Sequence, residues 1–357
     1  MRSLGLLGLF LVGCATPVDD SGATCEDCRG VATADTDDLP DAGVGEELDA
    51  GEGDGGPVTP PPPANLADTG LCTDTACTAI ASGVVEFRPR WALWSDGASK
   101  RRWIALPPGT RIDTTDMDYW RYPTGTKLWK EFVRDGVRVE TRYMVKTGSG
   151  DAAWSFVAYA WNAEQTIALP LPAGRANVLG TGHDIPSQET CLGCHENVKT
   201  RVLGFTAFQL DWNAPAPLAD LDDALARGWL TKAPPGTVSP HLPLPGSAQV
   251  QATLGYLHAN CGHCHNADSP LVNRPMFRLE AARISSVGIT RTYQSSVNIP
   301  GTAFGGATII AKPRDPDRSI IITRMNAADP KKRMPALGAE TIDAAGRSLL
   351  RTWISNL

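Results

Sequence analysis

Two neighbouring segments of the chain alternate apolar with polar residues, as half-buried β-strands do. The alternation runs through residues 126–133 and again through 137–145. An Arg-Asp-Gly sequence separates the two segments and favours a tight hairpin turn. Residues 154–161 are apolar almost throughout, which predicts a strand covered on both faces. The region 67–185 is therefore predicted to be rich in β-strands.

Tryptophan is concentrated in this β-rich region. Seven of the 10 tryptophans lie between Trp91 and Trp161. Large aromatic side chains fill the space between packed sheets, so the simplest interpretation is the core of a β-sandwich. A platform on which carbohydrate rings stack is the alternative interpretation.

Helical spacing replaces this alternation in the C-terminal half, with prolines between the segments. Residues 247–259 place apolar side chains on one stripe, and Ser247 is suited to cap a helix there. Residues 317–325 predict a shorter helix, and 341–357 gather apolar side chains on one face. Between 267 and 316 the sequence predicts loops. The predicted fold class is α+β with several domains, a β-sandwich-like N-terminal domain followed by an all-α C-terminal domain.

The first residues of the chain are typical of an export signal. An apolar stretch at 4–12 follows the basic residue Arg2 and leads into Leu-Val-Gly-Cys14. That sequence resembles the lipobox of bacterial lipoproteins, in which the cysteine is acylated and becomes the mature N-terminus. By the same resemblance, Ala15 favours the outer membrane, facing the periplasm or the cell surface. The alternative is an ordinary signal peptide with a chance cysteine at position 14.

Charge is distributed unevenly along the chain. Residues 15–66 hold 13 acidic residues and one basic residue, and they end in a run of prolines. Such a segment cannot bury enough apolar surface to fold, so we predict a disordered tether. Residues 67–357 carry 31 basic and 26 acidic side chains, although the whole chain has a net charge of -6. This small positive excess favours an acidic redox partner and does not predict binding to nucleic acid.

These patterns divide the chain into five predicted parts. They are a lipoprotein signal peptide (1–14), an acidic and proline-rich tether (15–66), a β-rich domain (67–185), a segment with one cysteine motif (186–240) and a second domain with another (241–357).

Export places the chain in an oxidising compartment, where cysteines are usually paired or ligated. The nine cysteines are Cys14 and four pairs with short spacings. Cys25 and Cys28 lie in the tether, and Cys72 and Cys77 stand at the entrance of the β-rich domain. We predict a short disulfide within each of these two pairs.

The other two pairs belong to C-x-x-C-H motifs. The first motif is Cys191, Cys194 and His195, and the second motif is Cys261, Cys264 and His265. This spacing attaches c-type haem: the thiols bond to its two vinyl groups, and the histidine becomes an axial ligand of the iron. With 9 Cys and 6 His in 357 residues, chance predicts roughly 0.004 such motifs. We therefore predict covalent haem c at the second motif and a second haem at the first.

The context of the second motif suggests its sixth ligand. A predicted helix leads directly into the motif, and Met334 stands in an Arg-Met-Pro sequence before the last helix. A thioether opposite histidine stabilises reduced iron, so Met334 is the predicted ligand. Met325 and Met276 are competitors, although core packing explains Met325 inside its short apolar helix. This order of helix, C-x-x-C-H, irregular middle, Met-Pro and closing helix resembles class I cytochrome c. The resemblance implies that the first and last helices cross at one edge of the haem.

The first motif lacks a following Met-Pro, and its sixth coordination position stays undecided. An open position is one possibility. His263, at a variable position of the second motif, is expected to point away from iron. The candidate sixth ligands are His183, His241, His258 and Met144.

A wider part of the chain resembles a family of exported bacterial proteins. These join a β-rich domain to a C-terminal cytochrome c-like domain. The resemblance implies this architecture and haem, and it supplies no substrate. The segments that carry it are 94–100, 102–107, 122–126, 140–142, 191–195, 260–266 and 333–338.

The predicted function is electron transfer by a c-type cytochrome lipoprotein, with an unidentified redox partner protein and membrane contact through the lipid anchor. One alternative is a haem-containing oxidoreductase subunit whose β domain binds a substrate or a metal. Five polar residues of the β-rich region are candidates to bind that substrate or metal, although they are more simply interpreted as surface residues in salt bridges. They are Asp96, Lys100, Arg102, Asp113 and Asp116.

Two further alternatives need no working haem. In one, the four cysteines of the two motifs bind a shared structural zinc ion or form disulfides. In the other, the protein is a binding module whose haem is vestigial.

Overall fold

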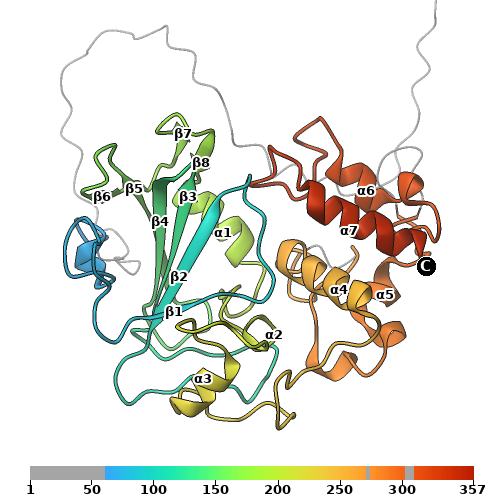
Figure 1. Cartoon of the computed structure of the whole chain (residues 1–357), viewed down its shortest axis with the longest axis horizontal. Helices are drawn as coiled ribbons and strands as arrows, with labels where there is room; N and C mark the ends of the chain where they lie inside the picture. Colours follow the sequence, from blue (N-terminus) through green and yellow to red (C-terminus); the bar gives the residue numbers. More distant parts are fainter. Residues whose placement is uncertain (1–60, 271–273, 302–308) are drawn as a thin grey trace, which may run out of the picture. The chain divides into compact units, whose positions relative to one another are not determined.

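A six-stranded antiparallel sheet is the largest element of the fold (Figure 1). The computed structural model describes residues 61–270, 274–301 and 309–357, all within one compact unit. The predicted signal peptide, the lipidation site Cys14 and the pair Cys25 and Cys28 lie outside the described residues.

The sheet is a meander in which strands adjacent in sequence are adjacent in space. Its strands are, in order, β1 (Val85–Phe87), β2 (Ser99–Ala105), β3 (Lys127–Arg134), β4 (Val137–Lys146), β5 (Trp154–Trp161) and β6 (Ala168–Pro170). A separate two-stranded sheet pairs β7 (Arg175–Val178) with β8 (His183–Ile185).

The predicted hairpin is confirmed by β3 and β4. Asp135 and Gly136 form the turn between them, with φ of 51° and 80°. A two-residue turn that follows the twist of the strands needs positive φ at both central residues, which Asp and Gly tolerate. The predicted third strand, 154–161, is β5.

The α-helices all follow the six-stranded sheet in the sequence, and the longest of them, α4, has 13 residues. The α-helices are α1 (Gln188–His195), α2 (Ala207–Leu210), α3 (Leu221–Ala226), α4 (Ala248–Asn260), α5 (Arg291–Ser296), α6 (Ile320–Met325) and α7 (Ala344–Ser355). The 3-10 turns are η1 (Ala67–Thr69), η2 (Ala281–Arg283), η3 (Val287–Ile289) and η4 (Pro316–Arg318). A membrane crossing needs a longer apolar helix than any in the described part of the chain.

The predicted helix at 247–259 corresponds to α4, and the Ser247 side chain caps it by accepting a hydrogen bond from the backbone N–H of Val250. The expected helix at 317–325 is divided into η4 and α6. Asp343 caps α7, two residues after the predicted start. The segment 267–316, predicted as loops, contains η2, η3 and α5 in its described part.

Apolar side chains cover both faces of the sheet. On one face, Trp103, Trp129 and Tyr143 stand opposite one another on β2, β3 and β4, and Leu66 and Leu71 pack against them. The rings of Trp129 and Tyr143 are stacked with centroids 5.7 Å apart. Full burial of one large apolar side chain contributes about 1.5–3 kcal/mol, so this row is a major part of the core.

The other face packs against the irregular segment that follows the first motif. Ile104 and Phe156 of the sheet contact a cluster that includes Phe205, Phe208 and Leu254. Because Leu254 belongs to α4, the same cluster joins the sheet to the C-terminal helices. A second cluster holds α4, α6 and α7 together, and its centre contains Leu257 and Trp353.

The predicted fold class is wrong in both halves. The tryptophan-rich region is one six-stranded sheet covered by turns, short helices, irregular chain and the small β7–β8 sheet, and not two large sheets packed face to face. The C-terminal half is not an all-α cytochrome c domain, because irregular backbone and isolated β-bridges, such as Val297 with Ala311, separate its short helices. Apolar positions on both faces of a strand show that each face is covered, but they do not show by which kind of element.

The crossing of α4 and α7 can be tested at Gly346. A Cβ atom at this position would overlap the ring of Tyr256 in α4. Alanine is favoured over glycine in a helix by about 1 kcal/mol, whereas overpacking costs about 1–3 kcal/mol. Because the overlap involves several atoms of the ring, the upper end of the overpacking cost applies, and we expect Gly346→Ala to lower the free energy of unfolding by about 2 kcal/mol in urea denaturation. Gly288→Ala is the control, because no atom lies within 4 Å of its Cβ position. Equal stability of both variants would contradict this crossing.

Candidate functional site

The first motif forms the end of α1. The Ser187 side chain caps this helix by accepting from the backbone N–H of Thr190, and the helix ends at His195. α1 contacts β5, where the ring of Phe156 lies 4.8 Å from that of His195. Cys191 and Cys194 are one helical turn apart, so both thiols lie on the same side of α1.

The His195 ring is held by the backbone. Its Nδ1 lies 2.6 Å from the carbonyl oxygen of Arg201. A carbonyl can only accept, so Nδ1 carries the proton and Nε2 keeps its lone pair. Among the described residues Nε2 has no hydrogen-bond partner. Burial lowers the pKa of His195 to about 4, and the ring is neutral at pH 7.

The second motif begins where α4 ends. Cys261 is the C-cap of α4, and its carbonyl accepts from the backbone N–H groups of Cys264 and His265 at 3.1 and 2.8 Å. The Nδ1 of His265 donates to the carbonyl of Pro275 at 3.0 Å. Burial lowers the pKa of His265 to about 4 as well. Both motifs therefore present a neutral imidazole oriented through Nδ1.

The tertiary structure brings the two motifs together. Donor atoms of Cys194, His263 and Cys264 all lie within 4.8 Å of one another. Between the motifs, the buried Asn266 side chain donates to the carbonyl of Asn197 at 2.9 Å. The Asn197 amide in turn lies 3.7 Å from the sulfur of Cys264. Residues 67 or more positions apart thus form one site.

The four thiols of this site are all free and half-buried. A hydrogen bond to Cys264, together with burial, raises the pKa of Cys194 to about 12. The same bond and the Asn197 amide lower the pKa of Cys264, because both favour its thiolate. Burial raises the pKa of Cys261 to about 12 and also raises that of Cys191.

Cys72 and Cys77 form a disulfide, and their Cα atoms are 5.0 Å apart. The bridge closes the turn that leads into the sheet. It lies beside the aromatic row on the face opposite α1.

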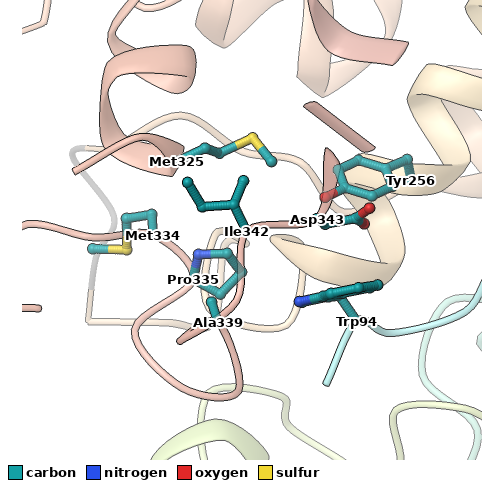
Figure 2. A pocket seen from close by; sticks show the side chains of 8 residues that line it. All are labelled: Trp94, Tyr256, Met325, Met334, Pro335, Ala339, Ile342 and Asp343. Atoms are coloured by element: carbon teal, nitrogen blue, oxygen red, sulfur yellow. The ribbon is translucent and has the colours of Figure 1, made fainter. Parts of the chain in front are cut away.

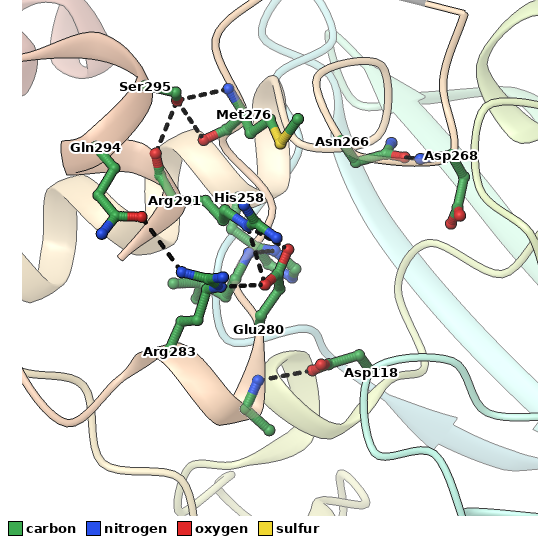
Figure 3. Close-up of polar contacts among 12 residues, drawn as sticks. Asp118, His258, Asn266, Asp268, Met276, Glu280, Arg283, Arg291, Gln294 and Ser295 are labelled. Carbon is green, nitrogen blue, oxygen red and sulfur yellow. Dashed lines mark hydrogen bonds and ion pairs between the residues drawn. The ribbon is translucent and has the colours of Figure 1, made fainter. Parts of the chain in front are cut away.

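Met334 lines a pocket between the C-terminal helices (Figure 2). Tyr256 of α4, Met325 of α6 and Trp94 lie around the same pocket, which has a cavity volume of about 10 Å³. Cys261 packs against the cluster that contains Met325. The two predicted competitors differ, because Met325 is buried in that cluster and Met276 is held through its backbone by Ser295 (Figure 3).

The candidate sixth ligands of the first motif have different partners. Both ring nitrogens of His241 are used, by the carbonyl of Gly236 and by Asp222. His183 bonds to Glu140 through Nε2 at 2.8 Å. Met144 lies beside Phe156 on the sheet face that α1 contacts.

His258 has a structural role in α4. Its Nδ1 accepts from the backbone N–H of Leu279 at 3.1 Å, which places the ring proton on Nε2. The ring packs edge-on against Trp91 and Phe208. Figure 3 shows His258 beside the segment in which Glu280 pairs with Arg291. The neutral ring with Nε2 protonated has no free lone pair, so His258 is not suited to bind a metal.

Sequence reasoning missed the asparagines that position the site. Asn260 is 1% exposed; its side chain accepts from the backbone N–H of Trp94 and donates to the carbonyl of Ala92. It therefore fixes the start of the second motif to the loop before β2. Asn260 and Asn266 flank this motif in the sequence, and buried asparagines of this kind have no distinguishing pattern in one sequence.

The polar candidates of the β-rich region also differ in their exposure and partners. Asp113 is a partly exposed residue that pairs with Arg121, as expected. Arg102 is not a surface residue in a salt bridge: it is 8% exposed. Lys100 is half-buried and donates to the carbonyl of Leu93.

Comparison with known proteins gives no match: no family model fits the chain, and no curated protein or solved structure is significantly similar to it. The resemblance drawn from the motifs stays a prediction.

The burial of His258 predicts a dependence of stability on pH. Burial lowers its pKa to about 3 in the folded chain, from the ordinary value of 6.5. As the pH falls, His258 therefore binds a proton in the unfolded chain before it does so in the folded chain. The stability of the folded chain falls as the pH drops from 6.5 towards 3. Between pH 7 and pH 5 the loss from this residue is about 2 kcal/mol. In urea denaturation, the free energy of unfolding of the original chain should fall between pH 7 and pH 5, and that of His258→Asn should fall by about 2 kcal/mol less. An equal loss in both would contradict the assignment.

Proposed function

We propose that the protein is an exported electron-transfer protein that binds haem c covalently through both C-x-x-C-H motifs. One observation carries this proposal: in each motif, two unpaired thiols accompany an imidazole whose Nδ1 donates to a backbone carbonyl. Histidines that bind metals usually donate their other ring N–H in this way, which orients the ring and makes the ligating nitrogen a better donor. Two motifs separated by 65 residues share this arrangement.

The donor atoms fit haem c. The thiols of Cys191 and Cys194 would hold one haem, with His195 as its axial ligand. The thiols of Cys261 and Cys264 would hold the other, with His265 on one side of the iron. Both imidazoles are neutral at pH 7, which is the state that binds iron.

The space at Met334 does not accommodate a porphyrin as it stands. The pocket there has a cavity volume of about 10 Å³, far below the roughly 300–1,000 Å³ of typical ligand pockets. Binding of haem there requires the segment with Met334 to lie further from α4. That segment is tied to the loop before β2 by the Trp94 ring N–H, which donates to the carbonyl of Thr341, and by Asp96, which accepts from the Thr341 N–H.

Bound haem supplies a reversible one-electron couple, and this transfer needs no catalytic acid or base. The chain would position the imidazoles and restrict water at the two motifs. We propose a redox partner protein as the source or acceptor of the electron. We further propose attachment to the outer membrane through a lipid on Cys14, which the tether would separate from the folded unit.

A second candidate function is a structural metal site. Cys194, His263 and Cys264 could together bind Zn²⁺, which prefers thiolate and imidazole ligands. The hydrogen bonds that lower the pKa of Cys264 support this candidate, because a thiolate binds zinc. The group differs from the four-thiolate site considered from the sequence, because it omits Cys191 and Cys261 and includes a histidine.

The two candidate functions predict different numbers of haem groups and zinc ions bound per chain. We expect two covalent haems per chain, by pyridine haemochrome and intact mass, when the chain is expressed with a c-type haem attachment system. Substituting serine for both cysteines of one motif should leave one haem, whichever motif is changed. Cys72→Ser with Cys77→Ser is the control and should keep two. A chain with no haem and one bound zinc ion would favour the structural metal site.

Met334 can be tested by redox titration of the haem-loaded chain. A thioether ligand raises the potential, so Met334→Leu should lower the potential of one haem by about 59 mV or more, a tenfold change in its reduction equilibrium. Met325→Leu is the matched control, because that side chain borders the same pocket from α6. Unchanged potentials in Met334→Leu would exclude it as a ligand.

A further inference from the structure

Three basic side chains form a row across the sheet, on the face that α1 contacts. Arg102 of β2 pairs in register with Lys130 of β3, and Lys130 pairs with Arg142 of β4. Side chains alternate between faces along each strand, so these directly opposed residues project from the same face. Like charges opposite one another destabilise a sheet, and an unfavourable row of this kind needs a compensating group.

The side chains of this row are largely shielded from solvent. Arg102 is 8% exposed, and its guanidinium has no hydrogen bond or ion pair within the described ranges. Lys130 is half-buried, and the only described contact of its ammonium group is the face of Phe132 at 4.6 Å. Lys100 and Arg142 lie over the same ring, at 6.0 and 4.4 Å. A cation–π contact is a weak attraction and does not replace a counter-ion.

Glu140 is a carboxylate whose charge acts on Lys130. It is fully buried and already bonded, to Arg142 at 2.6 and 2.9 Å and to His183 at 2.8 Å. Arg142 and His183 lower its pKa in spite of burial. Among the described residues, Arg102 and Lys130 therefore lack an anionic partner of their own, whereas the charges of Asp96 and Asp343 act on Lys100.

The pKa values agree with this shortage of negative charge. Burial, and then the neighbouring cations, lower the pKa of Lys130 well below its ordinary value and that of Lys100 to about 8. Burial lowers the pKa of Arg102 to about 10. An uncompensated buried charge is costly, so these shifts mark a place where an anion would be stabilising.

The row lies beside the first motif. The charge of Arg142 acts on the thiols of Cys191 and Cys194, and the charges of Lys130 and Arg142 act on His195. The ring of His195 also contacts Phe156, on the same face of β5. The cations and the predicted haem-attachment residues thus face one another.

We propose that the row formed by Arg102, Lys130 and Arg142 is a carboxylate-binding site whose ligand is the pair of propionate groups of the haem on the first motif. This inference rests on the proposed function. Haem c carries two carboxylates beside a neutral ring, and the row has at least two unpaired cations to receive them. Arginine binds carboxylates in a bidentate geometry, and lysine binds them as a point charge.

The test uses the haem-loaded chain with Arg102→Met and Lys130→Met, singly and together. Methionine keeps much of the side-chain volume without the charge. Arg101→Gln is the matched control, because Arg101 is the next residue of β2, lies on the opposite face and pairs with Glu86. The number of haem groups per chain is measured by intact mass. The reduction potentials of the two haems are measured by spectroscopic redox titration.

We expect the Met variants to keep two haems and to lower the potential of one, because removal of positive charge favours ferric iron. The double variant should change that reduction equilibrium about tenfold, which corresponds to about 59 mV. When the cysteines of the first motif are replaced by serine, the same substitutions should leave the remaining potential unchanged. Potentials that do not differ from those of Arg101→Gln would overturn the inference.

The haem-free chain provides a second measurement that separates the two proposals. There, Lys130→Met should raise the thermal midpoint, because it removes an unpaired charge, whereas in the loaded chain it should lower the midpoint. A rise in both forms would overturn the inference and leave the proposed function intact. If no haem attaches at all, the proposed function fails. A succinate-dependent rise in the midpoint, lost in the Met variants, would then assign the row to a free carboxylate and reject propionate.

Discussion

The position of both cysteine motifs depends on the burial of one face of the six-stranded sheet. Ile104 and Phe156 on that face pack into the cluster that contains Phe205, Phe208 and Leu254. The chain of this cluster begins just after the first motif and continues into α4, which ends at the second. Because the apolar side chains must leave water together, α1 and the end of α4 are drawn to the same region. The meeting of Cys194 with Cys264 is a consequence of this packing.

Polar contacts then give the site its orientation. Asn260 and Asn266 satisfy backbone groups on either side of the second motif, where unpaired buried donors or acceptors would be costly. Backbone carbonyls receive Nδ1 of His195 and His265. The apolar cluster thus brings the motifs together, and the hydrogen bonds determine which ring nitrogen remains available.

Electrostatics distinguish the two faces of the sheet. The face that carries Trp103 and Trp129 is closed by apolar packing and the nearby disulfide. The opposite face combines an apolar half, around Phe156, with the basic row at Lys130. A surface that offers both apolar contact and unpaired positive charge matches an amphiphilic ligand with an apolar ring and acidic groups. This agreement joins the proposed haem at the first motif to the charge pattern of the strands.

The sequence alone determined the elements with local causes: the β3–β4 hairpin, whose Asp-Gly turn needs positive φ, and α4, which Ser247 caps. It also determined the motif spacings, because two thiols one turn apart and an adjacent histidine are fixed by chain geometry. It predicted the wrong covering layers for the sheet and for the C-terminal half, since apolar periodicity does not specify a partner. The tertiary structure alone decided that the motifs adjoin and that Arg102, Lys130 and Arg142 share one row. Strand register and long-range packing bring such residues together, and neither leaves a signal at the separate positions.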